Sequence, residues 1–458
     1  MSDPTLPAAP TGMMDSELPV VVIGAGLVGC LLACTLARQG MAVAVYERRP
    51  DPRSSAPERG RSVNLALSRR GIDALERVAL VEAVMGPSIP MVGRMIHTTQ
   101  GSTRFQPYHA SGTEAIHSIS RTALNLTLLE AAAATPGVTL HFDHRLVGVD
   151  AEAGVAHLQS PTGEIEVAGA VIIGADGSRS AVREALVTSG LVQVVEEPLD
   201  DGYKELTIPP LPDGSFALDP HALHIWPRGA SMMIALPNPD GSFTCTLYWP
   251  QTGPDSFAQC QTAEDLHARF ERDYPDAIAL IPRLTEEYFA NPVGALGTVH
   301  TTPWISGRVA LIGDAAHAIL PFYGQGANCG FEDVVALAAC LRSAGGDWAR
   351  ALPEYQQARR DNAEAIARMA SQNFVEMRDK VHSPVFQATK RIEHALERAL
   401  PGLYRSRYDM VSFSTIPYAE VLRRERGQRM AAWGLLALGV GTLAGGLAAL
   451  AARGRGRP

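Results

Sequence analysis

A glycine-rich turn at 24–29, with the sequence GAGLVG, constrains the fold more than any other feature of the chain. It stands between an apolar stretch at 20–23, typical of a buried strand, and a helical pattern at 27–39. Its glycines are Gly24, Gly26 and Gly29. Such glycines permit a tight turn, close approach of a pyrophosphate and close packing of the helix on the strand. A second apolar stretch at 42–46 ends at Glu47, whose carboxylate can accept hydrogen bonds from a ribose. We therefore predict a βαβ unit that binds a dinucleotide, although the glycine pattern alone also occurs in ordinary loops.

Hydrophobic patterns along the rest of the chain predict an α/β protein with a second sheet. Further strands are expected at 138–142, 155–158, 171–174 and 309–312, and helices at 122–134, 331–343 and onward to residue 398. The stretch 206–249 is rich in alternating, β-branched and aromatic residues, and turns that contain Pro, Asp and Gly interrupt it. This middle stretch predicts an antiparallel sheet.

Composition excludes several classes of protein. The chain has 458 residues, of which 46% are hydrophobic and 19% charged, so it can form two or three packed units. Its net charge of -8 argues against a nucleic-acid-binding surface, which needs a basic stripe. The six cysteines are far apart and show no C-x-x-C spacing, so we expect neither a metal site nor disulfides, and a reducing compartment.

The two ends of the chain differ. Residues 1–18 have no basic or apolar signal-peptide region, so we expect a disordered leader. Residues 431–452 carry no charge and arginines flank them on both sides, so a helix there can span a bilayer. Gly441 and Gly445 form a G-x-x-x-G pattern that also suits a buried helix in a homodimer. The flanking arginines favour a membrane anchor, because headgroup regions accommodate them.

Two later segments bear on which dinucleotide is bound. They are GADGSRSAVR, starting at Gly174, and GDAAHAILPFYGQGANCGFED, starting at Gly313. Both resemble fingerprints of the FAD-dependent aromatic hydroxylases, and the resemblance implies FAD. Asp314 follows an apolar strand, so it can accept a hydrogen bond from a ribityl hydroxyl or can simply cap a helix. Gly324 and Gly326 allow close backbone approach before a helix whose amides can face an isoalloxazine, unless they form only a glycine-rich loop.

Several stretches between residues 20 and 424 narrow the resemblance. They are GRSVNLALSRRGIDAL, GRMIH, GYKELTIPP, LHIWPRG, MMIALPN, SFTCTLYWP, NFVEMRDK and RYDMVSFSTIPYAE. In this order they resemble the kynurenine 3-monooxygenase family. The resemblance implies an α/β fold with a Rossmann-like FAD-binding domain of the p-hydroxybenzoate hydroxylase type, an antiparallel substrate domain and a C-terminal helical region. The expected segments are 19–80, 119–195 and 300–345 for the FAD-binding domain, 81–118 and 196–299 for the substrate domain, and 346–429 for the helical region.

The resemblance also implies an activity. L-Kynurenine would be hydroxylated to 3-hydroxy-L-kynurenine with NADPH and O2, through a flavin C4a-hydroperoxide, in tryptophan degradation and NAD biosynthesis. The flavin carries the chemistry, so no catalytic side chain is demanded. The chain shows no second strand–G-x-G-x-x-G–helix unit for a nicotinamide cofactor. For hydroxylases without this unit, the resemblance implies that NADPH binds only transiently. A C-terminal anchor would place the enzyme on the cytoplasmic side of a membrane. The alternatives are a hydroxylase of another aromatic acid and a flavin-binding membrane protein without oxygenase activity.

The expected substrate pocket combines a carboxylate clamp with an apolar slot, because kynurenine has an amino acid head and an aminoaryl ketone tail. The resemblance assigns polar contacts to Arg94, Tyr108, Asn373 and Tyr408. It assigns the slot to Leu223, Met232, Ile234, Leu236, Tyr248, Pro321 and Phe322, and further substrate contacts to Glu376 and Met377. Without the resemblance these residues would be interpreted as surface or core residues. Tyr323 and Ala327 depart from the family pattern.

The resemblance supplies the remaining cofactor residues. The predicted FAD contacts, beyond the glycines of the first turn and Glu47, are Val28, Tyr46, Arg48, Arg49, Arg61, Ala66, Arg121, Leu146, Asp176, Ala181, Asp314, Gly324, Gly326, Ala327 and Asn328. His317 could be a general base, but its motif is shared by hydroxylases of different substrates, which favours a structural role.

Overall fold

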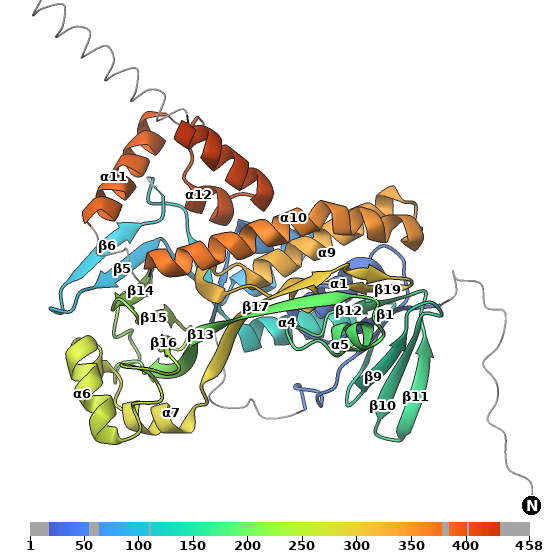
Figure 1. The fold of residues 1–458 in the computed structure, drawn as a ribbon, viewed down its shortest axis with the longest axis horizontal. Helices are drawn as coiled ribbons and strands as arrows, with labels where there is room; N and C mark the ends of the chain where they lie inside the picture. Colours follow the sequence, from blue (N-terminus) through green and yellow to red (C-terminus); the bar gives the residue numbers. More distant parts are fainter. Residues whose placement is uncertain (1–17, 55–63, 110, 378–383, 401–402, 431–458) are drawn as a thin grey trace, which may run out of the picture.

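The computed structural model describes residues 18–54, 64–109, 111–377, 384–400 and 403–430, and begins with the predicted βαβ unit (Figure 1). Strand β1 (Val20–Ile23), helix α1 (Leu27–Ala37) and strand β2 (Val43–Tyr46) confirm it. The two strands pair in parallel, with Val20 opposite Val43. All eight strand residues are buried, which agrees with a parallel sheet covered on both faces.

The first sheet contains six strands of the described chain, in the order β18-β19-β12-β1-β2-β8. Its other members are β8 (Val138–His141), β12 (Val171–Gly174), β18 (Ile305–Ser306) and β19 (Val309–Leu311). All neighbours pair in parallel except β18 and β19. Helix α1 packs against α4 (Arg121–Ala134) and α9 (Gly326–Ser343). The carboxyl ends of β1, β2, β12 and β19 therefore meet at one edge of the sheet.

Two smaller sheets adjoin this domain. One contains β9 (Arg145–Asp150), β10 (Val155–Ser160) and β11 (Gly163–Ala168). The other contains β3 (Asn64–Leu67), β4 (Ile89–Met91) and β7 (Ile116–Ser120). The helices of this part are α2 (Arg69–Arg77), α3 (Val81–Met85) and α5 (Ala181–Thr188).

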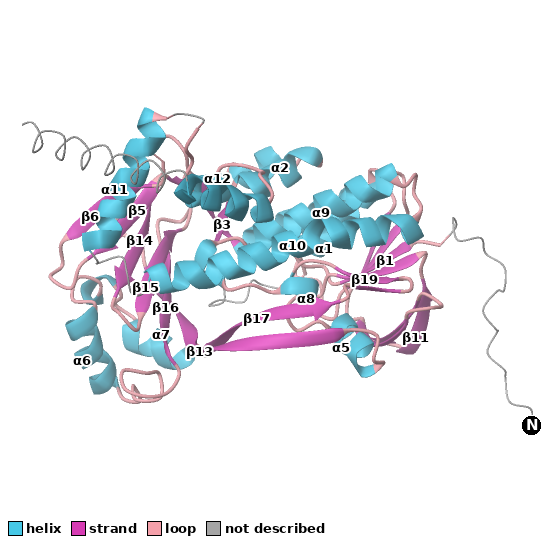
Figure 2. Ribbon diagram, turned by 45° about the horizontal axis from the view of Figure 1, so that its top comes forward, coloured by secondary structure: helices cyan, strands magenta, loops and turns pink. Residues whose placement is uncertain are grey.

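The predicted antiparallel sheet forms, but it is larger than the sequence indicated. Its order is β17-β13-β16-β15-β14-β5-β6. The strands are β5 (Gly93–His97), β6 (Thr103–Pro107), β13 (Gln193–Ile208), β14 (Ala222–Pro227), β15 (Met232–Pro237), β16 (Phe243–Pro250) and β17 (Gly294–Thr302). The pairing of β14 with β5 is parallel. Figure 2 shows β13 and β17 running from the first domain into this sheet, so each strand crosses an expected domain boundary.

Helices cover the second sheet and the cofactor domain. On one face of the second sheet lie α6 (Ala263–Asp273), η1 (Ile278–Leu280) and α7 (Leu284–Ala290), whose apolar residues form one core with those of β13–β16. The later elements are α8 (Asp314–His317), η2 (Pro321–Tyr323), α9, α10 (Trp348–Val375), α11 (Pro384–Ala399) and α12 (Arg407–Ser412). Helix α10 packs along α9, and α11 and α12 lie beside β5 and β6 (Figure 1).

One helix boundary was predicted wrongly. Helix α9 begins at Gly326, five residues before the expected start at 331. The residues GANCG lack an apolar period, and their glycines disfavour a helix, so propensity alone does not indicate it. The side chain of Asn328 holds this first turn, because it donates to Ala66 O at 2.9 Å and accepts from Ser68 N at 3.0 Å.

The predicted leader and membrane segment fall almost wholly on parts of the chain that the structure leaves undescribed. Residues 1–17 and 431–452 both lie outside the described residues. Among the helices of the described chain, none has the length and apolar character needed to cross a bilayer.

Candidate active site

The predicted cofactor residues converge on the carboxyl edge of the parallel sheet. Gly24 follows β1, Glu47 follows β2, Asp176 follows β12 and Asp314 follows β19. In open α/β sheets this edge is where ligands bind. The sequence pattern predicted Gly24, Glu47 and Asp314, the resemblance implied Asp176, and the sheet order brings the four together.

The glycine turn is tight on one side and open on the other. Gly24 has φ +106°, and a Cβ there would lie 2.7 Å from Ala175 O. A Cβ on Gly29 would overlap the carbonyl oxygen of Gly24. A Cβ on Gly26, in contrast, would meet no protein atom within 4 Å. The protein itself therefore does not require glycine at 26, and the open space there fits a pyrophosphate that approaches the backbone.

Glu47 is fixed as an anion beside this turn. Its Oε2 accepts from Ala25 N at 3.0 Å, and its Oε1 accepts from Arg49 N at 3.1 Å and Arg49 Nε at 2.7 Å. Burial alone would raise the pKa of this carboxyl, but the Arg49 guanidinium and the two amides hold it below its usual value. A fixed carboxylate at this position can accept from ribose hydroxyls.

The two aspartates of the later motifs differ in their surroundings. Asp176 accepts from Ser180 Oγ at 2.5 Å and Ala181 N at 2.7 Å, so both of its oxygens hold the start of α5. The carboxylate of Asp314 accepts no hydrogen bond from the described residues, and its burial raises its pKa. Asp314 is only partly buried, so its carboxylate can accept hydrogen bonds from outside the protein, and ribityl hydroxyls would supply such donors.

The glycine segment before α9 packs against strand β3. Gly324 has φ +65°, and a Cβ on it would lie 3.1 Å from the Ala66 Cβ. Asn328 donates to the carbonyl oxygens of both residues, at 2.8 Å and 2.9 Å. A Cβ on Gly326 would meet no protein atom within 4 Å, and no side chain caps α9. The free N-terminal amides of α9 and the open space beside Gly326 fit the electron-rich end of an isoalloxazine.

Other predicted cofactor residues surround this edge. Val28 packs beneath Gly313, Tyr46 stacks on His141 with ring centroids 4.6 Å apart, and Leu146 is buried. Burial raises the pKa of Asp314, and the charge of Arg121 partly opposes that rise. The two side chains therefore lie near each other. Arg48 and Arg49 are exposed beyond β2, Ala181 begins α5, and Ala327 lies in the first turn of α9. Arg61 lies outside the described residues.

His317 is part of a buried ion-pair network. Its Nε2 lies 2.6 Å from Asp333 Oδ2, and its ring packs against Trp304. Asp333 also accepts from Gly313 N at 3.1 Å and from Arg359 Nε at 2.6 Å. His317, Cys329 and Asp333 lie close enough to be considered as metal ligands, but Arg359 already supplies the positive charge there. These contacts support the structural interpretation of His317.

The predicted carboxylate clamp forms a buried aromatic and cationic cluster. Tyr108 and Tyr408 stack with centroids 4.8 Å apart, and the Arg94 guanidinium carbon lies 4.8 Å from the Tyr408 centroid. Arg94 Nε and Tyr108 Oη are buried and form no hydrogen bond of good geometry, although Arg94, Tyr108 and Tyr408 interact with one another at longer range. Burial and the neighbouring Tyr408 hold the pKa of Tyr108 well above its usual value, so its hydroxyl keeps its proton. Two buried donors without well-formed hydrogen bonds therefore lie in one cluster, and an anionic acceptor would satisfy them.

The predicted slot residues line one face of the second sheet. Met232, Ile234 and Leu236 share that face of β15, as their alternation predicted. The apolar clusters that contain them also include Leu223, Tyr248, Phe322, Met377 and Tyr408. Pro321 begins η2 immediately before Phe322. Leu223 and Tyr408 contact both clusters, so the clamp and the slot adjoin.

The remaining predicted polar contacts lie at the end of α10. Asn373 is buried, and its Nδ2 donates to Phe322 O at 2.6 Å and to Met377 Sδ at 3.2 Å. Glu376 is partly buried and immediately follows α10. Asn373 therefore positions η2, in addition to any contact with substrate.

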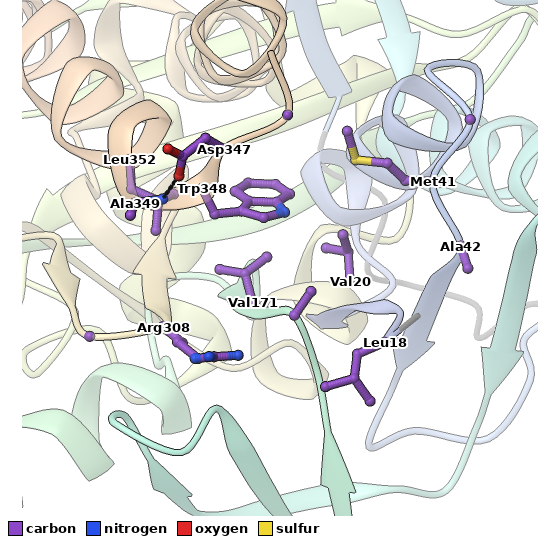
Figure 3. A pocket seen from close by; sticks show the side chains of 14 residues that line it. Leu18, Val20, Met41, Ala42, Val171, Arg308, Asp347, Trp348, Ala349 and Leu352 are labelled. Atoms are coloured by element: carbon purple, nitrogen blue, oxygen red, sulfur yellow. Dashed lines mark hydrogen bonds between the residues drawn. The ribbon is translucent and has the colours of Figure 1, made fainter. Parts of the chain in front are cut away.

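Two cavities differ in size and place. A cavity of about 30 Å³ is bounded by the clamp residues together with Gln106, Pro107, Glu393 and Ser406. A cavity of about 510 Å³ lies at the opposite, amino-terminal edge of the parallel sheet, where Figure 3 shows Met41, Arg308 and Trp348 around it. The larger cavity is remote from every predicted site residue. The smaller one is well below the 300–1,000 Å³ usual for a ligand pocket.

Sequence reasoning missed the residues that connect the C-terminal region to α9. Arg70 is completely buried, donates to Val411 O at 2.8 Å and Ile416 O at 2.5 Å, and pairs with Glu332. Tyr418 Oη donates to Gln325 Oε1 at 2.8 Å. The partners are distant in sequence, so no local pattern could have indicated them.

Comparison with known proteins identifies the relatives of this chain. Residues 17–370 match the family described as FAD binding domain. The chain is 48% identical over 402 residues to the kynurenine 3-monooxygenase of Myxococcus xanthus, which covers 87% of this chain and 86% of that protein. It is 46% identical over 417 residues to the kynurenine 3-monooxygenase of Xanthomonas axonopodis pv. citri, and the match covers 90% of this chain and 91% of that protein.

Solved structures share the fold at lower identity. The tetrameric form of 2-methyl-3-hydroxypyridine-5-carboxylic acid oxygenase superposes with a TM-score of 0.66 at 21% identity, over 83% of this chain and 96% of that one. The p-nitrophenol 4-monooxygenase of Pseudomonas putida superposes with a TM-score of 0.65 at 20% identity, over 84% of this chain and 94% of that one. These structures support the fold.

Proposed function

Because the chain belongs to the kynurenine 3-monooxygenase family of FAD-dependent aromatic hydroxylases, we propose that it hydroxylates L-kynurenine to 3-hydroxy-L-kynurenine. NADPH and O2 are the co-substrates, and NADP⁺ and water are the other products. The observation that carries the choice of substrate is the pair of buried donors without well-formed hydrogen bonds on Arg94 and Tyr108, next to an apolar slot.

The cofactor edge fits FAD. Gly26 and Gly326 leave open space where the pyrophosphate and the isoalloxazine approach the backbone. Glu47 would hold a ribose and Asp314 the ribityl chain. When bound, FAD that NADPH has reduced activates O2 and supplies the oxygen atom that is transferred to the ring.

The side chains bind and orient the substrate. Arg94 would bind its carboxylate with a guanidinium fork, and Tyr108 would donate to the same group. Met232 and Ile234 would hold the aryl ring in a dry environment. The ring amine of kynurenine already activates the carbon that is attacked, so the protein mainly supplies position and excludes water.

We also propose that residues 431–452 attach the enzyme to the cytoplasmic side of a membrane. Their lack of charge and the flanking arginines support this assignment. Pairing of two such segments through Gly441 and Gly445 is the competing proposal.

Mass analysis of the product tests the function directly. Purified protein that retains FAD should convert kynurenine, NADPH and O2 to a product heavier by one oxygen atom, with one labelled atom when ¹⁸O2 is used. A phenolic acid is the matched control, because it lacks the amino acid head. Hydroxylation of the phenolic acid but not of kynurenine would overturn the proposal in favour of another aromatic hydroxylase. NADPH oxidation that neither compound alters would point to a flavoprotein without oxygenase activity.

A further inference from the structure

The second sheet is assembled from two separate pieces that carry different parts of the candidate pocket. The hairpin β5–β6 carries Arg94 and leads directly into Tyr108. The strands β14–β16 carry the apolar slot. The pieces meet at the parallel pairing of β14 with β5, where Leu223 lies opposite Arg94. No turn connects these two strands, so turn geometry cannot set their register.

A hydrogen-bonded chain of side chains links β5 and β14 on the face of the sheet opposite the candidate pocket. His97 on β5 and His224 on β14 are each only 2% exposed. His97 Nε2 lies 2.9 Å from His224 Nδ1, and His97 Nδ1 lies 2.6 Å from Asp276 Oδ2. The other end of the chain is His224 Nε2, which lies 2.9 Å from the carbonyl oxygen of Asp219. The His97 ring also stacks on Trp226, with centroids 3.9 Å apart.

The ends of this chain determine where its protons lie. A carbonyl oxygen only accepts, so His224 Nε2 must carry a hydrogen. In a neutral His224 ring the Nδ1 then accepts, and His97 Nε2 must donate to it. A carboxylate also only accepts, so His97 Nδ1 donates to Asp276. Both ring nitrogens of His97 are therefore engaged, one by the Asp276 carboxylate and one by His224.

The surroundings support this assignment. Burial lowers the pKa of His224 to about 4, which keeps the ring neutral near pH 7. Burial alone would raise the pKa of Asp276, but its bonds to His97 and Trp226 hold it below its usual value. Asp276 accepts from Trp226 Nε1 at 3.0 Å.

The other charged groups at the junction are Arg228, Asp273 and Asp219, and the charge of Asp219 opposes the fall in the pKa of His224 that burial causes. Arg228 donates to His97 O at 2.9 Å and to the carbonyl oxygen of Asp273. The Arg228 guanidinium therefore donates to carbonyl oxygens, and the Asp276 carboxylate remains hydrogen-bonded to His97.

We propose that the chain from His224 through His97 to Asp276 is a positioning device that sets the distance between the carboxylate clamp and the apolar slot. It does so by fixing β5 against β14, and it thereby selects ligands by the separation of their carboxylate and aryl groups. Neither histidine contacts the substrate. This inference rests on the proposed function, because it needs Arg94 to bind the carboxylate.

Two ligands separate positioning from general structural support. L-Kynurenine occupies both the clamp and the slot, whereas ortho-aminoacetophenone has the same aryl ketone and lacks the amino acid head. We expect His97→Phe and His224→Phe to raise the KM for kynurenine about tenfold, the size of one lost hydrogen bond, with kcat and FAD content nearly unchanged. The inhibition constant of ortho-aminoacetophenone should not change, because the slot remains intact. His267→Phe, an exposed histidine on α6, is the matched control.

The outcomes distinguish this inference from the proposed function. An unchanged kynurenine KM in both variants, or equal weakening of both ligands, would overturn the positioning role. If Arg94→Lys leaves the kynurenine KM unaltered, the clamp itself is wrong and the proposed substrate fails first. If Arg94→Lys raises KM and the histidine variants do not, only the positioning role fails.

Nitrogen-15 NMR of labelled histidine gives an independent readout. The ring nitrogens of His97 and His224 that face each other should both show the chemical shifts of hydrogen-bonded nitrogens. In Asp276→Asn the shift of His97 Nδ1 should change, because this nitrogen loses its carboxylate partner. Unchanged His97 shifts in Asp276→Asn would overturn the hydrogen-bonded chain.

Discussion

Arg94 and Tyr108 place two hydrogen-bond donors side by side in the interior: the guanidinium carbon lies 5.5 Å from the tyrosine ring centroid, and neither Arg94 Nε nor Tyr108 Oη forms a hydrogen bond of good geometry. Each such atom costs about 1–3 kcal/mol when left unpaired in a folded protein. The tyrosines raise the pKa of Arg94 even though burial alone would lower it, so its charge persists. A substrate carboxylate would satisfy both donors.

The first prediction concerns the fork geometry of Arg94. Arg94→Lys should raise the KM for kynurenine by the equivalent of about 1.5–3 kcal/mol, because two directed contacts become one point-charge contact. FAD content should stay constant. Steady-state kinetics measures the change, and Arg104→Lys on exposed β6 is the control. Wild-type kinetics for Arg94→Lys would remove this residue from the site.

A second prediction tests the cofactor edge. Gly26→Val should reduce FAD affinity more than about tenfold, equivalent to about 1.4 kcal/mol, because its side chain occupies space meant for the pyrophosphate. Folding should be retained, since a Cβ at Gly26 meets no protein atom within 4 Å. Flavin absorbance after gel filtration measures retention. Gly427→Val, at an equally open but distant position, should remain yellow. A yellow Gly26→Val protein would contradict the assignment.

The parallel-sheet half of the site was predictable because its signals are local. Gly24, Gly26 and Gly29 lie within one turn, and Glu47 lies at the end of the next strand, so period and spacing indicate them. The clamp was different: Arg94 and Tyr408 were available only through family resemblance, since either residue alone is compatible with ordinary packing.

The contacts that hold the clamp in place were not predictable from the sequence. Arg70 donates to Ile416 across 346 residues of sequence, and His97 contacts His224 across 127. No periodicity or spacing encodes such pairs, because the sheet order and the path of the C-terminal segment create them. The start of α9 at Gly326 was missed for the same reason, since Asn328 stabilises it through β3.

A third prediction concerns acid stability. His224 has a folded pKa of about 4, against about 6.5 in an unfolded chain. The unfolded state therefore takes up a proton at a higher pH, so this residue makes stability fall as pH drops from about 6.5 toward 4. Between pH 7 and pH 5 the loss should be about 2 kcal/mol. Denaturant unfolding at both pH values should show that the free energy of unfolding falls less in His224→Phe than in the unmodified protein. An identical pH slope for the two proteins would contradict this role.

A fourth prediction concerns residues 431–452. The full chain should sediment with membranes, because about 22 residues of helix would extend about 33 Å, enough for a hydrocarbon core of about 30 Å. A chain truncated after Met430 should move to the soluble fraction and retain FAD and kynurenine turnover. Fractionation with absorbance at flavin wavelengths measures both properties. Full-length protein that stays in the supernatant without detergent, and is dimeric there, would favour the paired-helix alternative.

The last prediction compares two neighbouring arginines of α10. Arg359 is buried and bridges Asp333 at 2.6 Å to Glu332 at 3.1 Å, whereas Arg360 forms an exposed pair with Glu364 at 3.4 Å. Arg359→Met should lower the free energy of unfolding by about 3–5 kcal/mol, because it leaves the buried carboxylate of Asp333 without its guanidinium partner. Arg360→Met should change it by less than about 0.5 kcal/mol, since exposed pairs contribute little. Urea unfolding measures both variants. Asp333 also holds His317 and Gly313 N, so Arg359→Met should weaken FAD retention too, whereas Arg360→Met should not. Equal stability and equal FAD retention of the two variants would show that the network supports neither the fold nor the cofactor edge.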